Sequence, residues 1–216
     1  AALLLSVLPP EQVHLLYVDT GLMRKGESRE VGQALRQLGA RHLHEVDASR
    51  EFFAALRGVD DPEEKRRRIG DLFIRVQESS IAAAGFSNEY LAQGTLYTDL
   101  IESGKGVGRK AEVIKSHHNV RSPLVERKRE QGLLLEPLSG LYKDEVRRLG
   151  RHLGVHGETV DRHPFPGPGL AVRVLGEVTP ENVRVLREAD ALFLSELKAR
   201  GLYGEIWQAF AVLLPV

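Results

Sequence analysis

Two carboxylates and a glycine fall close together near the middle of the chain. In the stretch LAQGTLYTDLIES, Gly94 is followed by Asp99 and Glu102. Glycine lets a ligand come close to the backbone because it has no side chain. Carboxylates beside a polyphosphate commonly hold Mg²⁺ through their oxygens. We therefore treat Gly94, Asp99 and Glu102 as candidates for a ligand site.

A second polar group follows a glycine-rich, basic stretch at residues 103–112. It contains Lys115, His117 and His118. Adjacent histidines point to opposite sides of an extended chain, and no cysteine or third ligand lies nearby in the sequence. A shared zinc ion is therefore not expected. Residue types alone also fit an ordinary surface loop.

Two further groups are open to a structural or a functional interpretation. The stretch DPEEKRRRIGDLF places Arg66, Ile69 and Phe73 on one helix face, although charge runs are usually solvated faces and aromatics at this spacing are usually core. Lys143 and Asp144 stand just before another helical pattern, where Asp144 could simply be the N-cap.

The elements that would position these residues alternate between strand and helix. Short apolar runs predict strands at 13–18, 43–47 and 90–92, and helical spacing predicts helices at 28–38, 49–57, 61–84, 122–131, 144–153 and 181–200. Asp61 and Pro62 are expected as the N-cap and first residue of the helix at 61–84. Such alternation predicts an α/β fold whose parallel sheet is covered by helices on both faces.

Ligands bind such sheets beyond the carboxyl ends of the strands. That rule places Asp19 and the stretch 93–95 on the binding edge. The segment RHPFPGPGLAVRVLGE, residues 162–177, interrupts the pattern with three prolines. Proline excludes both a helix interior and a central strand, so we expect a stiff break there and a boundary near Pro164.

Composition excludes several classes of protein. Thirty basic and thirty acidic residues cancel, so the chain lacks the overall charge of a nucleic-acid binder. No apolar run is long enough for a membrane span. The chain has no cysteine, which excludes disulfides and fits a cytoplasmic protein. Both ends interrupt a structural pattern, as expected for a piece of a longer protein.

Several motifs together make the chain resemble GMP synthetases. They are YVDTGLMRKGE, DPEEKRRRIGDLF, LAQGTLYTDLIESG, IKSHHNV, EPL with YKDEVRRLG, and RHPFPGPGLAVRVLGEVT. The resemblance is to the ATP-pyrophosphatase domain and the start of the C-terminal dimerisation domain. It implies a Rossmann-like fold of the adenine nucleotide alpha-hydrolase type, with domains at residues 1–163 and 164–216.

The resemblance implies ATP-dependent amination of XMP to GMP. ATP first adenylates the xanthine C2 oxygen, and ammonia made from glutamine by a glutaminase domain or subunit then displaces AMP. It also implies ATP and Mg²⁺ as cofactors and a homodimer, with no nucleic-acid or membrane partner. The family's Ser-Gly-Gly-Val-Asp-Ser loop would precede Ala1, so the chain alone is expected to be inactive.

The resemblance also implies roles for individual residues. Val18, Phe73, Gly94 and Lys143 would bind ATP, and Arg66, His117 and His118 would bind XMP. The expected catalytic residues are Lys143, Asp99, Glu102, Lys115 and Asp144, with Asp99 and Glu102 as Mg²⁺ ligands. Thr98 and Leu100 depart from the family pattern without removing a functional group, and the stretch RSPLVERKREQG departs as well.

Two other hypotheses remain. Because the pyrophosphate loop is absent, the chain could be a non-catalytic nucleotide-binding or assembly module. Other pyrophosphatase-loop enzymes, such as NAD synthetase and argininosuccinate synthetase, share the sheet but lack the HPFPGPG motif.

Overall fold

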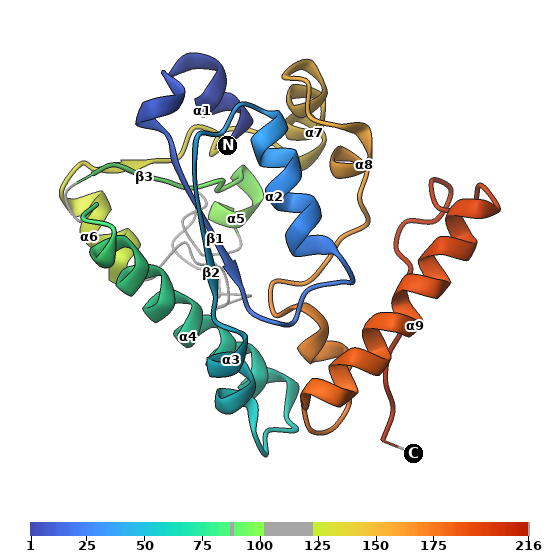
Figure 1. The fold of residues 1–216 in the computed structure, drawn as a ribbon. Helices are drawn as coiled ribbons and strands as arrows, with labels where there is room; N and C mark the ends of the chain where they lie inside the picture. The colour runs from blue at the N-terminus through green and yellow to red at the C-terminus, as the bar shows by residue number, and fades with distance from the viewer. Residues whose placement is uncertain (87–88, 102–122, 216) are drawn as a thin grey trace. The chain divides into compact units, whose positions relative to one another are not determined.

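A computed structural model describes residues 1–86, 89–101 and 123–215 (Figure 1). The chain divides into two compact units, which we describe separately. Unit 1 comprises Ala1–Phe73 and Leu153–Val216, and unit 2 comprises Ile74–His152. The domain boundary near Pro164 that the sequence predicts follows the family's organisation and stays a prediction.

Unit 1 is built around a parallel pair of strands. Strand β1 (His14–Asp19) pairs with β2 (His42–Asp47), and their last residues, Asp19 and Asp47, are in register. Helix α2 (Glu27–Gln37) makes the crossover between them. Both strands were predicted from apolar runs, and the observed bounds differ from the prediction by one residue.

Unit 1 contains further helices before and after this pair. They are α1 (Ala2–Val7), η1 (Pro10–Gln12), α3 (Ser49–Leu56), the first part of α4 (Pro62–Ala83), α8 (Gly157–Val160), η4 (Gly169–Arg173) and α9 (Pro180–Ala199). Leu22, Phe52, Leu56 and Leu170 are fully buried. Burial of apolar side chains away from water is the main favourable contribution to the free energy of folding.

Helix α4 begins as its sequence predicts. The Asp61 carboxylate accepts a hydrogen bond from the Glu64 N–H at 2.8 Å, and Pro62 is the first helical residue. Aspartate at this position satisfies a backbone donor that has no partner within the helix. The predicted N-cap is therefore confirmed.

Unit 2 has a second, much shorter parallel pair. Strands β3 (Leu91–Ala92) and β4 (Leu134–Leu135) are accompanied by α5 (Tyr97–Leu100), α6 (Pro123–Glu130) and α7 (Lys143–His152). The described residues thus form a mixed α/β structure with two separate two-stranded parallel sheets. The single covered sheet expected from the sequence is not seen in these residues, because β3 and β4 pair only with each other.

The Pro-Gly segment forms neither helix nor strand before Gly169. Its backbone instead makes specific contacts, since Gly169 N–H donates to Pro166 O at 2.9 Å and Leu170 N–H donates to Leu22 O at 2.8 Å. The expectation that this segment interrupts regular structure is confirmed. None of the described helices combines the length and apolar character that a membrane span requires.

Lys65 connects α4 to the chain that follows η4. The side chain is 1% exposed, and its Nζ donates to Val174 O at 2.8 Å and to Gly176 O at 2.6 Å. Burial lowers the pKa of Lys65 below its ordinary value. The folded protein therefore releases this proton at a lower pH than the unfolded chain does.

We expect Lys65→Met to lower the free energy of unfolding at pH 7 by about 1–2 kcal/mol, because buried carbonyl oxygens lose their donor. At a pH between the pKa of Lys65 in the folded protein and its higher pKa in the unfolded chain, the unfolded chain binds more protons than the folded protein does. The free energy of unfolding of the wild type should therefore increase as the pH rises through this range. Lys65→Met should lack that increase. Urea titrations at several pH values would measure both effects. Arg67→Met, at an exposed site on the same helix, is the control. Equal pH slopes for wild type and Lys65→Met would contradict the assignment.

Candidate functional site

The carboxyl ends of β1 and β2 carry two aspartates whose carboxylates hold the following turns. Asp19 Oδ1 accepts the Gly21 N–H at 2.8 Å, and Asp47 Oδ1 accepts the Ser49 N–H at 2.9 Å. The hydrogen bonds from Ser49 lower the pKa of Asp47. Asp19 was predicted at this edge of the sheet from the sequence, whereas Asp47 was not predicted there. Both carboxylates shape the edge of the sheet through local turns.

Val18 lies one residue before this edge. It pairs with Val46 in the ladder and is 7% exposed, so its side chain belongs to the core. The core interpretation of Val18 is therefore confirmed. A role for its backbone in reading a nucleotide base is compatible with that burial and stays a prediction.

The loop after β1 is fixed by residues from the distant C-terminal part of unit 1. Arg187 Nη2 donates to Gly21 O at 2.6 Å, and Arg187 Nε donates to Met23 O at 2.9 Å. Arg162 forms an ion pair with the buried Glu27. These contacts fix the backbone immediately beyond the edge of the sheet.

A buried charge cluster, formed by Arg24, Arg173 and Asp190, lies behind this loop. Arg24 Nε is 3.0 Å from Asp190 Oδ2, and Arg173 Nη1 is 3.5 Å from Asp190 Oδ1. Phe165, from the Pro-Gly segment, faces both guanidinium groups, with ring-centroid distances of 4.8 Å and 5.1 Å. Burial and the charge of Arg24 lower the pKa of Arg173. The cluster joins the loop after β1, the Pro-Gly segment and α9.

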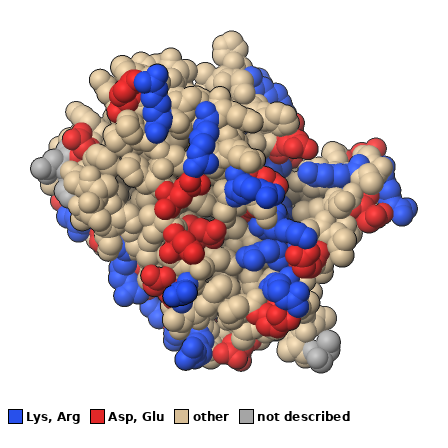
Figure 2. Space-filling view, viewed as in Figure 1, with Lys and Arg blue, Asp and Glu red and all other residues tan. Residues whose placement is uncertain are grey.

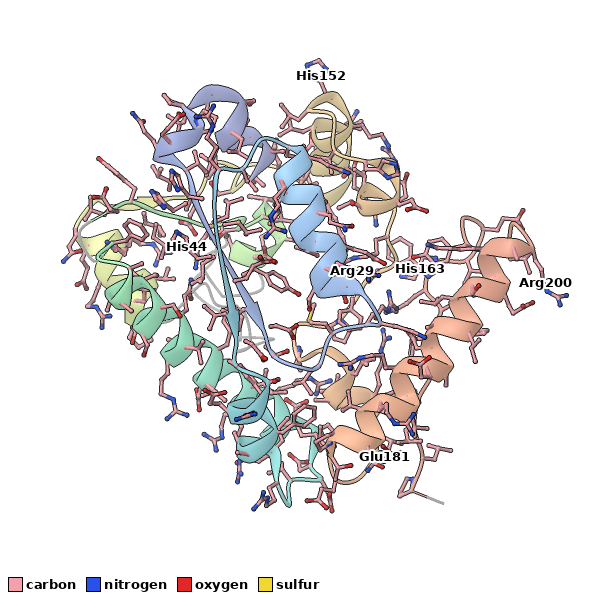
Figure 3. All side chains as sticks on the ribbon, viewed as in Figure 1. Arg29, His44, His152, His163, Glu181 and Arg200 are labelled. Atoms are coloured by element: carbon pink, nitrogen blue, oxygen red, sulfur yellow. The ribbon has the colours of Figure 1, made fainter. Side chains whose placement is uncertain are left out.

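His163 also has a structural role (Figure 3). Its ring stacks on Tyr203 with centroids 3.8 Å apart, and its Nδ1 accepts the Ala209 N–H at 3.2 Å. The proton of the neutral ring therefore lies on Nε2, which donates to Tyr203 O at 2.8 Å. Arg162, His163 and Arg173, which all belong to the segment 162–177, thus hold parts of unit 1 together.

In unit 2 the carboxyl ends of β3 and β4 bring a second set of polar groups together. Gly94 is exposed, and a Cβ added there would meet no atom within 4 Å. Thr95 Oγ1 donates to Glu136 Oε1 at 2.7 Å. Glu136 follows β4 directly and was not recognised in the sequence, although its place after an apolar pair could have indicated it. The backbone at Gly94 is thus accessible to a ligand, and the hydrogen bond between Thr95 and Glu136 holds the next residue in place.

Asp99 serves as a cap in this structure. Its Oδ2 accepts the Leu96 N–H at 2.8 Å at the start of α5. A carboxylate has about four lone-pair positions, so this bond leaves oxygen sites that fit a magnesium ion. In the described part of the chain, no group of three or more histidine or acidic side chains is arranged to hold a metal ion. Magnesium at Asp99 therefore stays a prediction.

Lys143 is exposed and is the first residue of α7. The Glu145 carboxylate accepts the Tyr142 N–H at 2.8 Å, whereas Asp144 lies inside the first turn and is exposed. The alternative interpretation of Asp144 as the N-cap is therefore wrong, because α7 begins one residue earlier and Glu145 bonds the backbone there. Tyr97 and Tyr142 meet edge to face at 5.2 Å, which places the two segments of this site side by side.

Arg66 and Phe73 lie on α4, where their spacing predicts a common face. Arg66 pairs with Glu63, and Phe73 is half-buried. Their ligand roles stay predictions. Glu102, Lys115, His117 and His118 lie outside the described residues.

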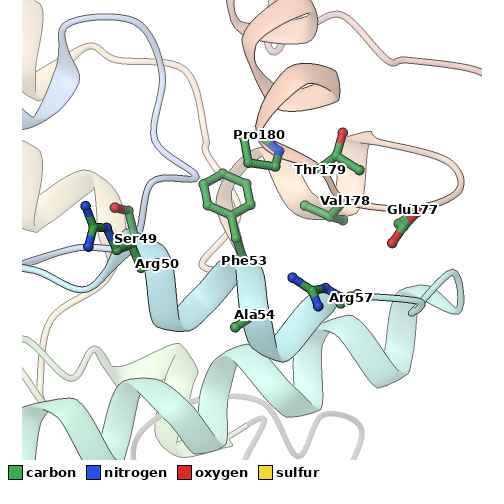
Figure 4. Close-up of a pocket in the computed structure, with 9 residues that line it drawn as sticks. All are labelled: Ser49, Arg50, Phe53, Ala54, Arg57, Glu177, Val178, Thr179 and Pro180. Carbon is green, nitrogen blue, oxygen red and sulfur yellow. The ribbon is translucent and has the colours of Figure 1, made fainter.

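A pocket of about 570 Å³ opens in unit 1 between α3 and the start of α9 (Figure 4). Phe53 and Pro180 face each other across it, and Arg50, Arg57 and Glu177 line it. None of the site residues predicted from the sequence lines this pocket.

On the face seen in Figure 2, acidic and basic side chains are interspersed, as the zero net charge suggests.

Comparison with curated proteins identifies relatives along the whole chain. The chain is 53% identical over 213 residues to a protein of Symbiobacterium thermophilum named GMP synthase (glutamine-hydrolyzing). It is 51% identical over 216 residues to proteins of that name from Bdellovibrio bacteriovorus and Rhizobium etli. These alignments cover 99–100% of the chain but only 40–42% of each relative. No protein-family model matches the chain. By this homology the chain belongs to the GMP synthase family, within a segment that makes up about 40% of its relatives' length.

Proposed function

We propose that the chain is the ATP-pyrophosphatase segment of a glutamine-hydrolysing GMP synthase, a ligase of purine biosynthesis. The observation that carries the proposal is 50–53% identity along 95–100% of the chain to proteins of that name. The two parallel strand pairs, each with polar groups at its carboxyl end, support a Rossmann-like nucleotide site. ATP, Mg²⁺ and XMP are the proposed ligands.

In the proposed reaction, the C2 oxygen of XMP attacks the α-phosphorus of ATP and pyrophosphate leaves. Ammonia then attacks C2, and AMP leaves. Transfer of this kind depends on positioning and charge stabilisation more than on covalent help from the protein. Lys143 would neutralise phosphate charge, and the open backbone at Gly94 would let the nucleotide approach. The bound magnesium would add further charge neutralisation at Asp99 and Glu102.

The proposed partners and location follow from the same homology. A glutaminase domain or subunit would supply ammonia, and two copies would associate through the C-terminal domain that begins after Pro164. We propose a cytoplasmic location.

The proposal is tested by ATP–pyrophosphate exchange in a protein extended at both ends by the family's remaining segments. We expect exchange that depends on XMP. Binding of ATP with no XMP-dependent exchange would favour the alternative, a non-catalytic nucleotide-binding or assembly module. The absence of both would contradict the proposed function.

Lys143→Ala in that extended protein is expected to slow XMP-dependent adenylation about 100-fold, the effect typical of losing one group that stabilises charge in a transition state. The side chain is exposed, so its loss should leave the fold and thermal stability unchanged. Lys25→Ala, at an exposed ion pair in unit 1, is the matched control. Unchanged exchange in Lys143→Ala would refute the role of Lys143.

A further inference from the structure

Three histidines meet at the amino end of the β1–β2 pair, away from the edge described above. His14 and His42 are the first residues of their strands and are in register, and His44 lies two residues along β2. Residues two apart in a strand share a face. The strands are six residues long, so at ~3.3 Å per residue His14 and His42 lie about 16 Å along their strands from Asp19 and Asp47, and His44 lies about 10 Å from Asp47.

The three rings contact one another. The ring centroids of His14 and His42 are 4.4 Å apart, and those of His14 and His44 are 5.4 Å apart. His14 Nδ1 lies 3.1 Å from His44 Nε2. Figure 3 labels His44 on this strand. We call this group the histidine triplet.

The distance between the two nitrogens has a chemical meaning beyond a hydrogen bond. A zinc–imidazole bond is about 2.0–2.1 Å long, so two nitrogens on one ion lie about 2.9 Å apart at a right angle and about 3.3 Å apart at the tetrahedral angle. The observed 3.1 Å falls within that range. An ion bound by both nitrogens would replace the hydrogen bond between them, and each ring would rotate to turn its lone pair toward the ion.

The surroundings of the triplet favour such an ion. Imidazole is a preferred ligand of zinc, nickel and copper, and it ligates in its neutral form. His14 is exposed and His44 is half-buried, so an ion can reach the pair from solvent while the strand ladder holds both backbones. His42 stacks on His14 and covers one face of that ring.

We propose that His14 and His44 chelate one divalent transition-metal ion through His14 Nδ1 and His44 Nε2, with His42 supporting the His14 ring and water completing the coordination. With two protein ligands, the pair is a smaller site than the groups of three or more that were considered above. The inference does not depend on the proposed nucleotide chemistry, because the triplet lies at the opposite end of the strands.

The test is calorimetric titration of the 216-residue chain with NiCl₂ at neutral pH. We expect one ion per chain, with affinity at least tenfold lower in His14→Asn and in His44→Asn. His152→Asn, at an exposed histidine at the end of α7, is the control and should bind as the wild type does. A smaller loss in His42→Asn is expected. Wild-type affinity in both His14→Asn and His44→Asn would overturn the proposal.

A second measurement needs no variant that could misfold. Long-range ¹H–¹⁵N correlation spectra of the histidine rings would be recorded with and without ZnCl₂. The resonances of His14 Nδ1 and His44 Nε2 should shift together on saturation. If both stay in place while other histidine nitrogens shift, the site does not exist.

Discussion

Replacing Asp190 with asparagine is expected to lower the free energy of unfolding by about 3–5 kcal/mol, the cost of removing one partner from a buried ion pair. Asp190 is 1% exposed and faces Arg24 and Arg173. Arg24 Nη2 and Arg173 Nη2 are also buried and find no hydrogen-bond acceptor in the described part of the chain. The cluster already holds more positive than negative charge, and the substitution removes the carboxylate that both guanidiniums share.

Asparagine keeps the shape of the side chain and an oxygen for the Ala211 N–H, which donates to Asp190 Oδ1 at 3.1 Å. The substitution thus removes the charge and replaces the oxygen that faces Arg24 Nε with an amide N–H donor. Without Asp190 the pKa of Arg173 should fall further, because Asp190 is one of the groups that raise it. Urea denaturation followed by circular dichroism measures the loss. Glu188→Gln, at an exposed ion pair on the same helix, is the control, and equal losses in the two variants would refute the account.

Gly169→Ala is expected to destabilise the protein by about 2–5 kcal/mol. The residue has a φ of +65°, a conformation that costs an L-residue about 1–2 kcal/mol. A Cβ there would lie 2.4 Å from Leu22 O, which accepts the Leu170 N–H. Relieving that contact would disturb a well-packed region, at about 1–3 kcal/mol more.

The neighbouring glycine provides a matched control. Gly167 lies in the same segment, and a Cβ added there would meet no atom within 4 Å. Gly167→Ala should therefore melt close to the wild-type temperature, whereas Gly169→Ala should melt well below it in a thermal scan. Similar melting temperatures for the two variants would show that the close approach to Leu22 does not constrain the fold.

The sequence predicts local features of this fold well. The Asp61 cap, the strands at β1 and β2 and the non-helical Pro-Gly segment each follow from residues a few positions apart, where capping, periodicity and proline geometry act directly. The interpretation of Asp144 as the N-cap of α7 fails because the helix begins at Lys143, one residue before Asp144, and helix ends are the least certain feature of a sequence pattern.

Contacts across long stretches of chain could not be predicted in this way. Nothing in the spacing of Arg24, Arg173 and Asp190 indicates that they meet, and the pairing of Thr95 with Glu136 depends on how two short strands align. The histidine triplet likewise depends on the register of β1 against β2. The ligand roles of Val18, Phe73, Gly94 and Lys143 rest on homology and await the experiments above.

The hydrogen bonds from Arg187 to the loop after β1 have a consequence for folding during synthesis of the chain. Its bond to Gly21 O joins residues 166 positions apart. At synthesis rates of about 5–20 residues per second, that loop would wait roughly 8–33 s for its partner to leave the ribosome. Until then the N-terminal strands would lack their final contacts, and their apolar side chains would stay more exposed to water.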